Sequence, residues 1–262
     1  MPSLLSTAGL NEQPITLVLI SDTHSCHSSL DPLPEGDILI HAGDITEHGT
    51  IKEIEEFVQW FSTLPYKYKI FVAGNHDHSL EPGHTYRSAL RQVDGRFDNG
   101  EYVVAKSPEE SVRLIQSIDL LQDTNTIYLR PDRATVTVKI RDRQLVVHGS
   151  PCTPLSFGPN AFMRERSYLD KLWLDAPMSD VLVSHAPPRG LLDQALNGRH
   201  LGCDGLKSAV ERTRPRLVVC GHVHEARGVQ HLQWDETSTT VVNAAVMNRS
   251  KAIQWGAQLI VI

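Results

Sequence analysis

Two short stretches decide the fold of this chain: ITLVLISDTH at residues 15–24 and DILIHAGD at residues 37–44. Each begins with a short apolar run rich in β-branched residues and ends in polar residues, which is typical of buried parallel strands. We therefore expect two central strands, at residues 15–21 and 37–41. In both stretches an aspartate follows within a few residues of the strand end.

A helix and a third strand are predicted next. The residues from 50 to 64 have apolar side chains at spacings of three and four, which predicts an amphipathic helix. Thr50 is placed to cap this helix, and Glu53 completes a capping box. Residues 68–73 (YKIFVA) repeat the strand pattern. The first 80 residues thus predict the order strand, strand, helix, strand, and ligands bind at the carboxyl ends of such strands in open α/β sheets.

The rest of the chain continues with strand and helix patterns. Ser107 and Pro108 predict the start of another helix, after a polar stretch at residues 82–106 that we expect to be a long loop with one short helix. Further helices are expected at residues 168–174 and 205–213. Further strands are expected at residues 127–129, 134–140, 144–147, 181–184, 216–220, 241–244 and 259–262.

Composition sets the class of protein and excludes several partners. Of the 262 residues, 40% are hydrophobic and 21% are charged, which indicates a globular rather than a disordered or fibrous chain. The formal net charge of −6 lacks the basic excess of nucleic-acid-binding proteins, so we expect no nucleic-acid partner. The four cysteines form no C-x-x-C pair, which favours reduced thiols. No apolar stretch approaches the roughly 20 residues of a membrane span, so we expect a cytoplasmic protein and no membrane partner.

Domain organisation follows from what separates the halves of the chain. No repeat and no linker rich in Pro, Gly or Ser divides them. We therefore expect a flexible N-terminal segment at residues 1–14 and a single domain at residues 15–262.

Five polar motifs at the predicted strand ends contain side chains that suit a metal ion. One such motif alone is weak, because an aspartate after a strand more often caps a helix or forms an Asx-turn. Together they deliver carboxylate, amide and imidazole groups to one crevice, which favours a metal site. The motifs are Asp22-Thr23-His24, Gly43-Asp44, Gly74-Asn75-His76-Asp77, Ser184-His185-Ala186-Pro187 and Gly221-His222-Val223-His224.

In this order the motifs resemble those of the calcineurin-like metallophosphoesterase superfamily: D-x-H, G-D, G-N-H-[DE], H and G-H-x-H. The stretches GDILIHAGD, YKYKIFVAGNHD, SPCTP, SHAPPRG and GHVHEARG extend the resemblance to the subgroup of metallophosphoesterase-domain-containing proteins, from about residue 15 onward. The resemblance implies an α/β fold, the four-layer αββα sandwich. In this fold two mixed sheets lie face to face, helices lie outside, and a dimetal site lies at the strand ends.

The resemblance also implies two divalent metal ions. The first would be held by Asp22, His24, Asp44 and His224. The second would be held by Asp44, Asn75, His185 and His222, so that Asp44 bridges the two ions. Such mixed nitrogen and oxygen ligands suit Mn, Fe, Zn, Co or Ni without selecting one of them. Two carboxylates and a bridging hydroxide leave the centre with a formal charge of about +1, so it should attract an anion such as a phosphoester.

The remaining motif residues are candidates for catalysis and substrate binding. By resemblance, His76 lies beside the leaving group and donates a proton to it. Asp77 would orient the His76 imidazole, although a backbone carbonyl can do the same. Arg189, Arg227 and His148 are candidates for contact with the substrate.

Most of the other histidines have a simpler interpretation. His41 precedes Asp44 by three residues, so either a place behind the metal ligands or a satisfied core position fits it. The others lie in polar surroundings and are expected to be solvated: His27, His48, His78, His84, His200 and His231.

The predicted activity is hydrolysis of small phosphomonoesters or phosphodiesters, nucleotide-like substrates included, through attack by a metal-activated hydroxide. The partner would be a small anionic molecule, and the sequence does not determine the oligomeric state. Two alternatives stay open. One is a nucleotide-binding or scaffold protein with low turnover, and the other is the same dimetal site acting on a non-phosphate substrate.

Overall fold

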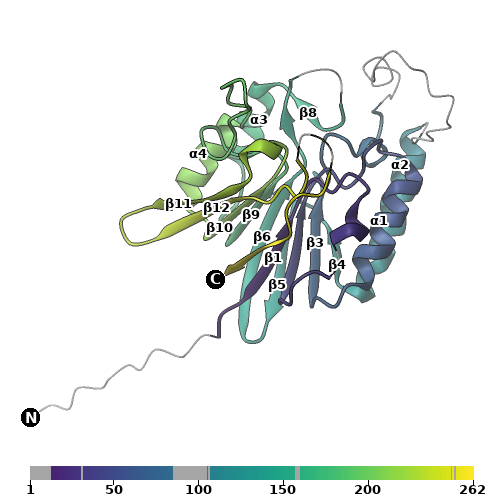
Figure 1. Cartoon of the computed structure of the whole chain (residues 1–262), viewed down its shortest axis with the longest axis horizontal. Helices are drawn as coiled ribbons and strands as arrows, with labels where there is room; N and C mark the ends of the chain where they lie inside the picture. The colour runs from purple at the N-terminus through teal and green to yellow at the C-terminus, as the bar shows by residue number, and fades with distance from the viewer. Residues whose placement is uncertain are drawn as a thin grey trace, which may run out of the picture.

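The computed structural model describes residues 13–30, 32–84, 105, 107–156, 160–248, 250 and 252–262. Two β-sheets lie face to face, and a pair of helices covers the outer face of each sheet (Figure 1). The predicted α/β four-layer αββα sandwich with two mixed sheets is confirmed.

The first sheet has five strands in the order β13-β1-β2-β3-β4. Strands β1 to β4 pair in parallel with their neighbours, and β13 is antiparallel to β1. The carboxyl ends of β1, β2 and β3 therefore meet at one edge of the sheet. The strands are β1 (Thr16–Ile20), β2 (Ile38–Ala42), β3 (Tyr68–Val72), β4 (Thr126–Tyr128) and β13 (Gln258–Val261).

The second sheet has six strands in the order β11-β12-β10-β9-β6-β5. Its four middle strands are parallel to one another, whereas β11 and β5 at the two edges are antiparallel to their neighbours. The strands are β5 (Thr135–Ile140), β6 (Arg143–Ser150), β9 (Val181–Ser184), β10 (Leu217–Cys220), β11 (Gly228–Gln233) and β12 (Ser238–Asn243). A separate pair joins β7 (Thr153–Pro154) to β8 (Met163–Arg164).

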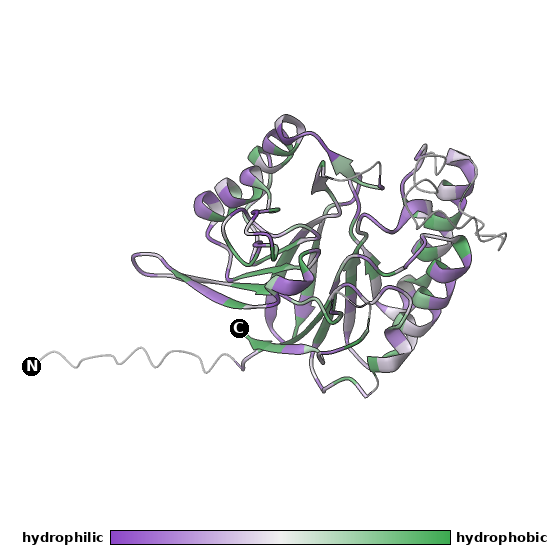
Figure 2. Ribbon diagram, turned by 45° about the horizontal axis from the view of Figure 1, so that its top comes forward, coloured by the Kyte–Doolittle hydropathy of each residue, from purple (hydrophilic) through white to green (hydrophobic). Residues whose placement is uncertain are grey.

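The main core lies between the two sheets. Leu19 and Ile40 from the first sheet and Val183 and Val219 from the second are fully buried in the same cluster. In Figure 2 the facing strands are largely green, whereas the outer helices carry purple segments. Burial of this apolar surface holds the sheets together and fixes the strand ends relative to one another.

The helices form the two outer layers. Helices α1 (Ile51–Thr63) and α2 (Pro108–Asp119) pack on the first sheet, and α3 (Arg166–Leu174) and α4 (Asp204–Thr213) pack on the second. Short 3₁₀ turns complete the structure: η1 (His27–Leu30), η2 (His78–Leu80), η4 (Leu120–Thr124) and η5 (His224–Ala226). None of the helices in the described ranges is long and apolar enough to cross a membrane.

The predicted helix starts are confirmed at α1 and α2. At α1 the Thr50 hydroxyl accepts from the Glu53 N–H at 3.1 Å, and the Glu53 carboxylate accepts from the Thr50 N–H at 2.9 Å. At α2 the Ser107 hydroxyl accepts from the Glu110 N–H at 3.4 Å.

The structure extends the predictions in some places. Strand β11 was not expected, because its side chains alternate only between partly and fully exposed positions at a sheet edge. The β7 and β8 pair was not expected either. The loop predicted at residues 82–106 falls mostly outside the described residues, as do residues 1–12. The division into a segment at residues 1–14 and a domain at residues 15–262 therefore stays a prediction.

Candidate metal centre

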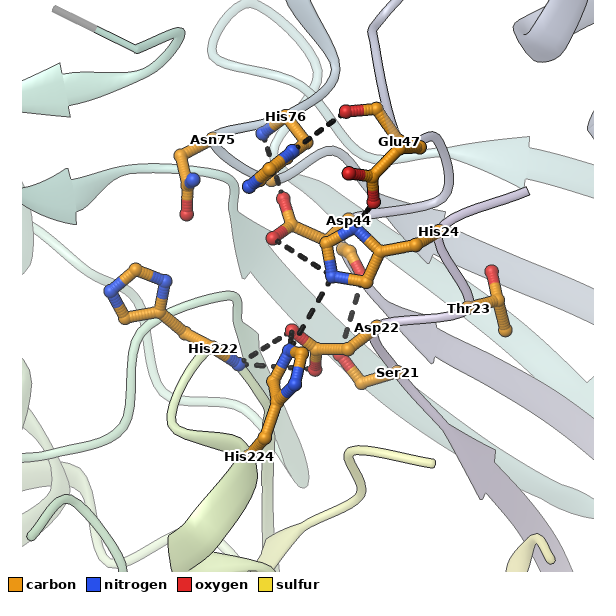
Figure 3. Close-up of polar contacts among 12 residues, drawn as sticks. Ser21, Asp22, Thr23, His24, Asp44, Glu47, Asn75, His76, His222 and His224 are labelled. Atoms are coloured by element: carbon orange, nitrogen blue, oxygen red, sulfur yellow. Dashed lines mark hydrogen bonds and ion pairs between the residues drawn. The ribbon is translucent and has the colours of Figure 1, made fainter. Parts of the chain in front are cut away.

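The five motifs meet at one edge of the sandwich, because each follows the carboxyl end of a parallel strand. Asp22 and His24 follow β1, Asp44 follows β2, and Asn75 follows β3. From the second sheet, His185 follows β9, and the loop with His222 and His224 follows β10. Figure 3 shows most of these side chains pointing toward one another from the two halves of the chain.

The backbone bends unusually at this edge. Four of the clustered residues have positive φ angles: Asp22 at 57°, His24 at 38°, Asp44 at 53° and His222 at 66°. A positive φ at a residue other than glycine costs on the order of 1–3 kcal/mol and tends to occur at functional sites. The surrounding sheets must therefore hold these four residues in place.

Two glycines let the motif loops approach each other closely. A Cβ at Gly74 would lie 2.3 Å from Oδ1 of Asp44, and a Cβ at Gly221 would lie 2.1 Å from Oδ2 of Asp22. Neither distance is compatible with a real side chain. Glycine is thus required at both positions for the two carboxylates to lie where they do.

One group of donors contains Asp22, His24 and His224. Nε2 of His224 lies 3.2 Å from Oδ1 of Asp22 and 3.4 Å from Nε2 of His24. The backbone N–H of His222 donates to both oxygens of the same carboxylate, at 3.0 and 3.1 Å. One ligand atom from each of the three side chains lies within 4.8 Å of the others, so this group can hold a metal ion.

A second group contains Asp44, His185 and His222, and its ligand atoms meet the same distance limit. Nε2 of His185 lies 3.3 Å from Oδ2 of Asp44 and 3.1 Å from Oδ1 of Asn75. The same Asp44 oxygen is 3.7 Å from Nε2 of His24. Asp44 therefore lies between the two groups, and its oxygen faces donors of both.

A third group overlaps the first two and contains His24, Asp44 and His76. It adds one residue to those that the sequence predicts as ligands, since His76 was expected to act on the substrate. His76 packs edge-on against His24, with ring centroids 4.7 Å apart. The backbone N–H of His76 donates to Oδ1 of Asp44 at 2.9 Å.

Backbone carbonyls aim the histidines at the centre. Nδ1 of His185 lies 2.9 Å from the carbonyl oxygen of Ala42, and Nδ1 of His224 lies 3.4 Å from that of Asn248. A carbonyl accepts only from an N–H, so Nδ1 carries the proton in each ring. Nε2 is then the nitrogen that faces the cluster, as in many protein metal sites.

The carboxylates raise the pKa values of His185 and His224, whereas burial lowers the pKa of His222 to about 4. Burial lowers the pKa of His185, but Asp44 outweighs burial and raises that pKa to about 9. For His224, burial likewise lowers the pKa, and Asp22 raises it to about 9. Burial raises the pKa of Asp22, but His224 reverses this and the net shift is downward. Divalent ions compete with protons for such groups, so the donor set fits a metal centre.

No lysine or arginine in the described ranges forms an ion pair with Asp22 or Asp44; their partners are histidines. The centre thus contains two buried carboxylates without a permanent positive charge beside them. Buried charges need a counter-charge or a metal. This observation supports the same conclusion as the choice of donor atoms.

Of the two partners considered for His76, Asp77 or a backbone carbonyl, the structure shows the carbonyl. Nδ1 of His76 lies 2.8 Å from the carbonyl oxygen of Glu47, so a backbone carbonyl orients the ring. The Asp77 carboxylate instead accepts from the N–H groups of Gly74, Ile45 and Thr46 and from the Thr46 hydroxyl. Asp77 is fully buried and stabilises the turn that follows Asp44.

The three candidates for substrate contact each have partners within the protein. His148 is buried, bonds the Thr135 hydroxyl at 2.8 Å and lies edge-on to Trp173. The side chain of Arg189 donates to the His200 carbonyl and lies 3.4 Å from Asp204.

Arg227 donates to the carbonyls of Ala245 and Gly256 and lies over the Trp255 ring. It therefore fixes the segment that also contains Asn248. Substrate contact by Arg189, Arg227 or His148 stays a prediction.

Two of the histidines expected to be solvated are buried. His27 packs against Phe57 and Trp60, and His78 stacks on His84 with ring centroids 5.0 Å apart. The prediction that His27 and His78 are solvated was based on their polar sequence neighbours. It was wrong because burial depends on residues that are distant along the chain.

His41 is a satisfied core histidine that also touches the metal loops. It is fully buried, bonds the Thr23 hydroxyl at 2.9 Å and accepts from the Gly43 N–H at 3.2 Å. His41 therefore occupies a satisfied core position and also lies behind the metal ligands, which are the two possibilities considered for it from the sequence.

Sequence reasoning missed Glu47 as a contributor to the centre. Its carboxylate oxygen Oε2 lies 3.3 Å from Nδ1 of His24, an ion-pair distance without hydrogen-bond alignment. Its carbonyl oxygen orients His76. Glu47 follows Asp44 by three residues, and this closeness in sequence could have indicated its place at the centre.

An αββα sandwich with Asp and His side chains gathered at its strand ends is the fold and site that the motifs of the calcineurin-like phosphoesterases predicted. The family model described as calcineurin-like phosphoesterase matches residues 15–226. The chain belongs to the calcineurin-like phosphoesterase family, as the sequence motifs predicted.

Among its relatives, the chain is 37% identical over 234 residues to Metallophosphoesterase domain-containing protein 1 of Homo sapiens. The match covers 87% of this chain and 65% of the human protein. The mouse protein of the same name gives the same figures. The chain thus spans about two thirds of the length of these relatives. A UPF0046 protein of Caenorhabditis elegans is 34% identical over 242 residues, covering 92% of this chain and 72% of that protein.

A solved structure of a Thermus thermophilus protein superposes with a TM-score of 0.53 at 14% identity. The match covers 87% of this chain and 89% of that one. At this identity the similarity supports the fold alone.

Proposed function

We propose that the protein is a dimetal hydrolase of small phosphomonoesters or phosphodiesters. The single observation that carries the proposal is the position of Asp44, whose oxygen Oδ2 faces His185 at 3.3 Å and His24 at 3.7 Å. A carboxylate between two donor groups can screen the repulsion between two neighbouring cations. Family membership supports the same reaction class.

The ligand sets follow the two donor groups. One ion would be held by Asp22, His24, Asp44 and His224. The other would be held by Asp44, Asn75, His185 and His222. When bound, two divalent ions in such a site supply an activated water and neutralise charge on the phosphoryl oxygens. The donor atoms suit Mn, Fe, Zn, Co or Ni alike.

The charge balance of a metal-loaded centre would favour an anionic substrate. The ligand carboxylates of Asp22 and Asp44 contribute two formal negative charges, fewer than the four positive charges of two divalent ions. A phosphoester therefore enters a region of net positive charge. The formal net charge of the whole chain, −6 with Asp22 and Asp44 included, disfavours long polyanions.

His76 is positioned to protonate the leaving group. The Glu47 carbonyl holds its Nδ1, and the Asp44 carboxylate accepts from its backbone N–H. Nε2 remains to exchange a proton with the substrate. In its doubly protonated imidazolium form, the ring would donate the Nε2 proton to the leaving oxygen as the phosphorus–oxygen bond breaks, and the neutral ring would keep its proton on Nδ1.

A metal-removal experiment tests the proposal. The purified chain is stripped with a chelator, and its metal content is measured before and after Mn²⁺ or Zn²⁺ is returned. Both samples are assayed on 4-nitrophenyl phosphate, bis(4-nitrophenyl) phosphate and 4-nitrophenyl acetate. We expect hydrolysis to disappear and then recover. Metal binding without hydrolysis would favour the low-turnover binding protein. Metal-dependent cleavage of a carboxylic ester alone would favour a non-phosphate substrate.

A further inference from the structure

The carboxylate of Glu53 joins the start of helix α1 to two metal loops. Its oxygen Oε2 completes the helix cap by accepting from the N–H and the hydroxyl of Thr50, at 2.9 and 2.8 Å. A helix cap needs no more than this. The other oxygen, Oε1, accepts from Ser25 at 2.8 Å, from the Glu47 N–H at 3.3 Å and from the His48 N–H at 3.2 Å.

The contacts of Oε1 lead to the centre through Glu47. The backbone N–H of Glu47 donates to Oε1 of Glu53 and to the Ser25 hydroxyl at 3.2 Å. The same residue orients His76 through its carbonyl and lies beside Nδ1 of His24 through its carboxylate. Glu53 thus holds the residue that contacts both imidazoles.

The second connection runs through Ser25. This residue directly follows His24 in the chain and has a positive φ of 63°. Its hydroxyl donates to Glu53, which ties the loop after β1 to the loop after β2. A residue in a sparsely populated backbone region keeps it only where its surroundings fix it.

We propose that Glu53 is a positioning residue for His24 and His76, acting through Ser25 and Glu47. The role in turnover rests on the proposed hydrolase function, but the positioning of the two rings does not. The competing explanation is that Glu53 only caps helix α1. The two carboxylate oxygens separate these explanations, since Oε2 serves the cap and Oε1 serves the loops.

Three variants distinguish a positioning role of Glu53 from a role in the helix cap alone. Glu53→Gln leaves one acceptor oxygen where five donors converge, so it weakens both sets of contacts. Ser25→Ala removes a contact of Oε1 and leaves the capping box intact. Thr50→Ala is the matched control, because it removes the cap hydroxyl and leaves every contact of Oε1 in place.

The first readout is the tautomer of His76, measured by ¹⁵N–¹H NMR of the imidazole on protein without added metal. A His76→Gln sample identifies the signals. We expect wild type and Thr50→Ala to show the proton on Nδ1. In Ser25→Ala and Glu53→Gln the two tautomers should mix, because Glu47 loses contacts that hold its carbonyl against the ring.

The second readout is steady-state hydrolysis of bis(4-nitrophenyl) phosphate by the Mn²⁺-loaded variants. We expect kcat to fall roughly 10- to 100-fold in Ser25→Ala and Glu53→Gln, with KM changed less, and to stay within about twofold in Thr50→Ala. If Glu53→Gln does not fold, Ser25→Ala carries the comparison.

An unchanged His76 tautomer in both loop variants would overturn the proposal. So would equal losses of kcat in Ser25→Ala and Thr50→Ala, which would assign Glu53 to the helix cap alone. If wild type hydrolyses no phosphoester, the proposed function fails, whereas the NMR comparison still decides the role of Glu53.

Discussion

Nδ1 of His76 lies 2.8 Å from the carbonyl oxygen of Glu47. This contact fixes the proton on Nδ1 and leaves Nε2 as the nitrogen that can reach a leaving group. Burial lowers the pKa of His76, and the negative charge of Asp44 only partly opposes that effect. The Glu47 carbonyl thus fixes the orientation of the His76 ring, and the Asp44 carboxylate partly restores its pKa. We assign this ring to proton transfer.

Replacing His76 with alanine should lower kcat roughly 10²- to 10⁴-fold, because the leaving group is no longer protonated. The metal content should stay at the wild-type value. The loss should be smaller for an aryl phosphate, whose acidic phenol needs little protonation, than for an alkyl ester. Steady-state rates on both esters check this expectation.

His231→Ala is the matched control, since this histidine is exposed on strand β11. It should leave both rates unchanged. Equal losses on the aryl and alkyl esters in His76→Ala would contradict proton donation and would leave His76 only the placement of the substrate.

Gly221→Ala should weaken metal binding on the Asp22 side of the centre. The added Cβ would lie 2.1 Å from Oδ2 of Asp22, so the carboxylate or the loop must move. We expect at least a tenfold loss of metal affinity, about 1.4 kcal/mol. Metal titration of the purified variant measures this loss.

Gly256→Ala provides the comparison, because a Cβ there meets nothing within 4 Å. It should bind metal like wild type. Unchanged metal affinity in Gly221→Ala would show that the close approach to Asp22 does not matter for the centre.

His148 should make the fold sensitive to acid. Burial lowers its pKa from 6.5 to about 4. Above pH 6.5 the side chain is neutral whether folded or unfolded, so its contribution is complete. As the pH falls from 6.5 toward 4, the unfolded chain binds a proton that the folded chain excludes, and the free energy of unfolding decreases by at most about 3 kcal/mol.

Thermal unfolding of wild type and His148→Gln across this range checks the effect. Glutamine keeps a polar group beside Thr135 and does not titrate. The Tm of wild type should fall more steeply with decreasing pH than that of the variant. Parallel curves would show that His148 stays as accessible to protons in the folded protein as in the unfolded chain.

Nucleic acids should bind weakly, and small phosphates should bind well. The net charge of −6 opposes a long phosphate backbone, whereas a mononucleotide or free phosphate meets the local positive charge of the metal centre. Calorimetric titration with DNA and with a mononucleotide, with and without metal, compares the two. Tight, salt-sensitive DNA binding would contradict this expectation, and so would failure of every phosphate to bind.

Much of the fold was predictable because its signals are local. The strand before Asp22, the strand before Asp44 and the cap at Thr50 are each encoded within a few neighbouring residues. Edge strand β11 was missed, because its partly exposed side chains give no clear alternation between buried and solvent-facing positions. Its pairing with β12 depends on tertiary structure.

At the centre, the sequence indicated which side chains converge but not what holds them. The burial of His27 and His78 comes from aromatic and histidine partners that no local pattern reveals. The backbone carbonyls of Glu47 and Asn248 accept from His76 and His224. Any residue type would offer the same carbonyl, so the residue types at these two positions do not predict the contacts. Only the folded backbone shows them.

The most direct test of the dimetal centre is the number of metal ions per chain in wild type and in Asp44→Asn. Asp235→Asn is the control, because that carboxylate is 92% exposed. After loading with Mn²⁺ or Zn²⁺ and removal of free metal, elemental analysis should find about two ions in wild type and in the control. Asp44→Asn should hold one or none and lose nearly all hydrolysis, because the carboxylate between the two donor groups is gone. An Asp44→Asn protein that keeps both ions and the full rate would contradict the shared centre.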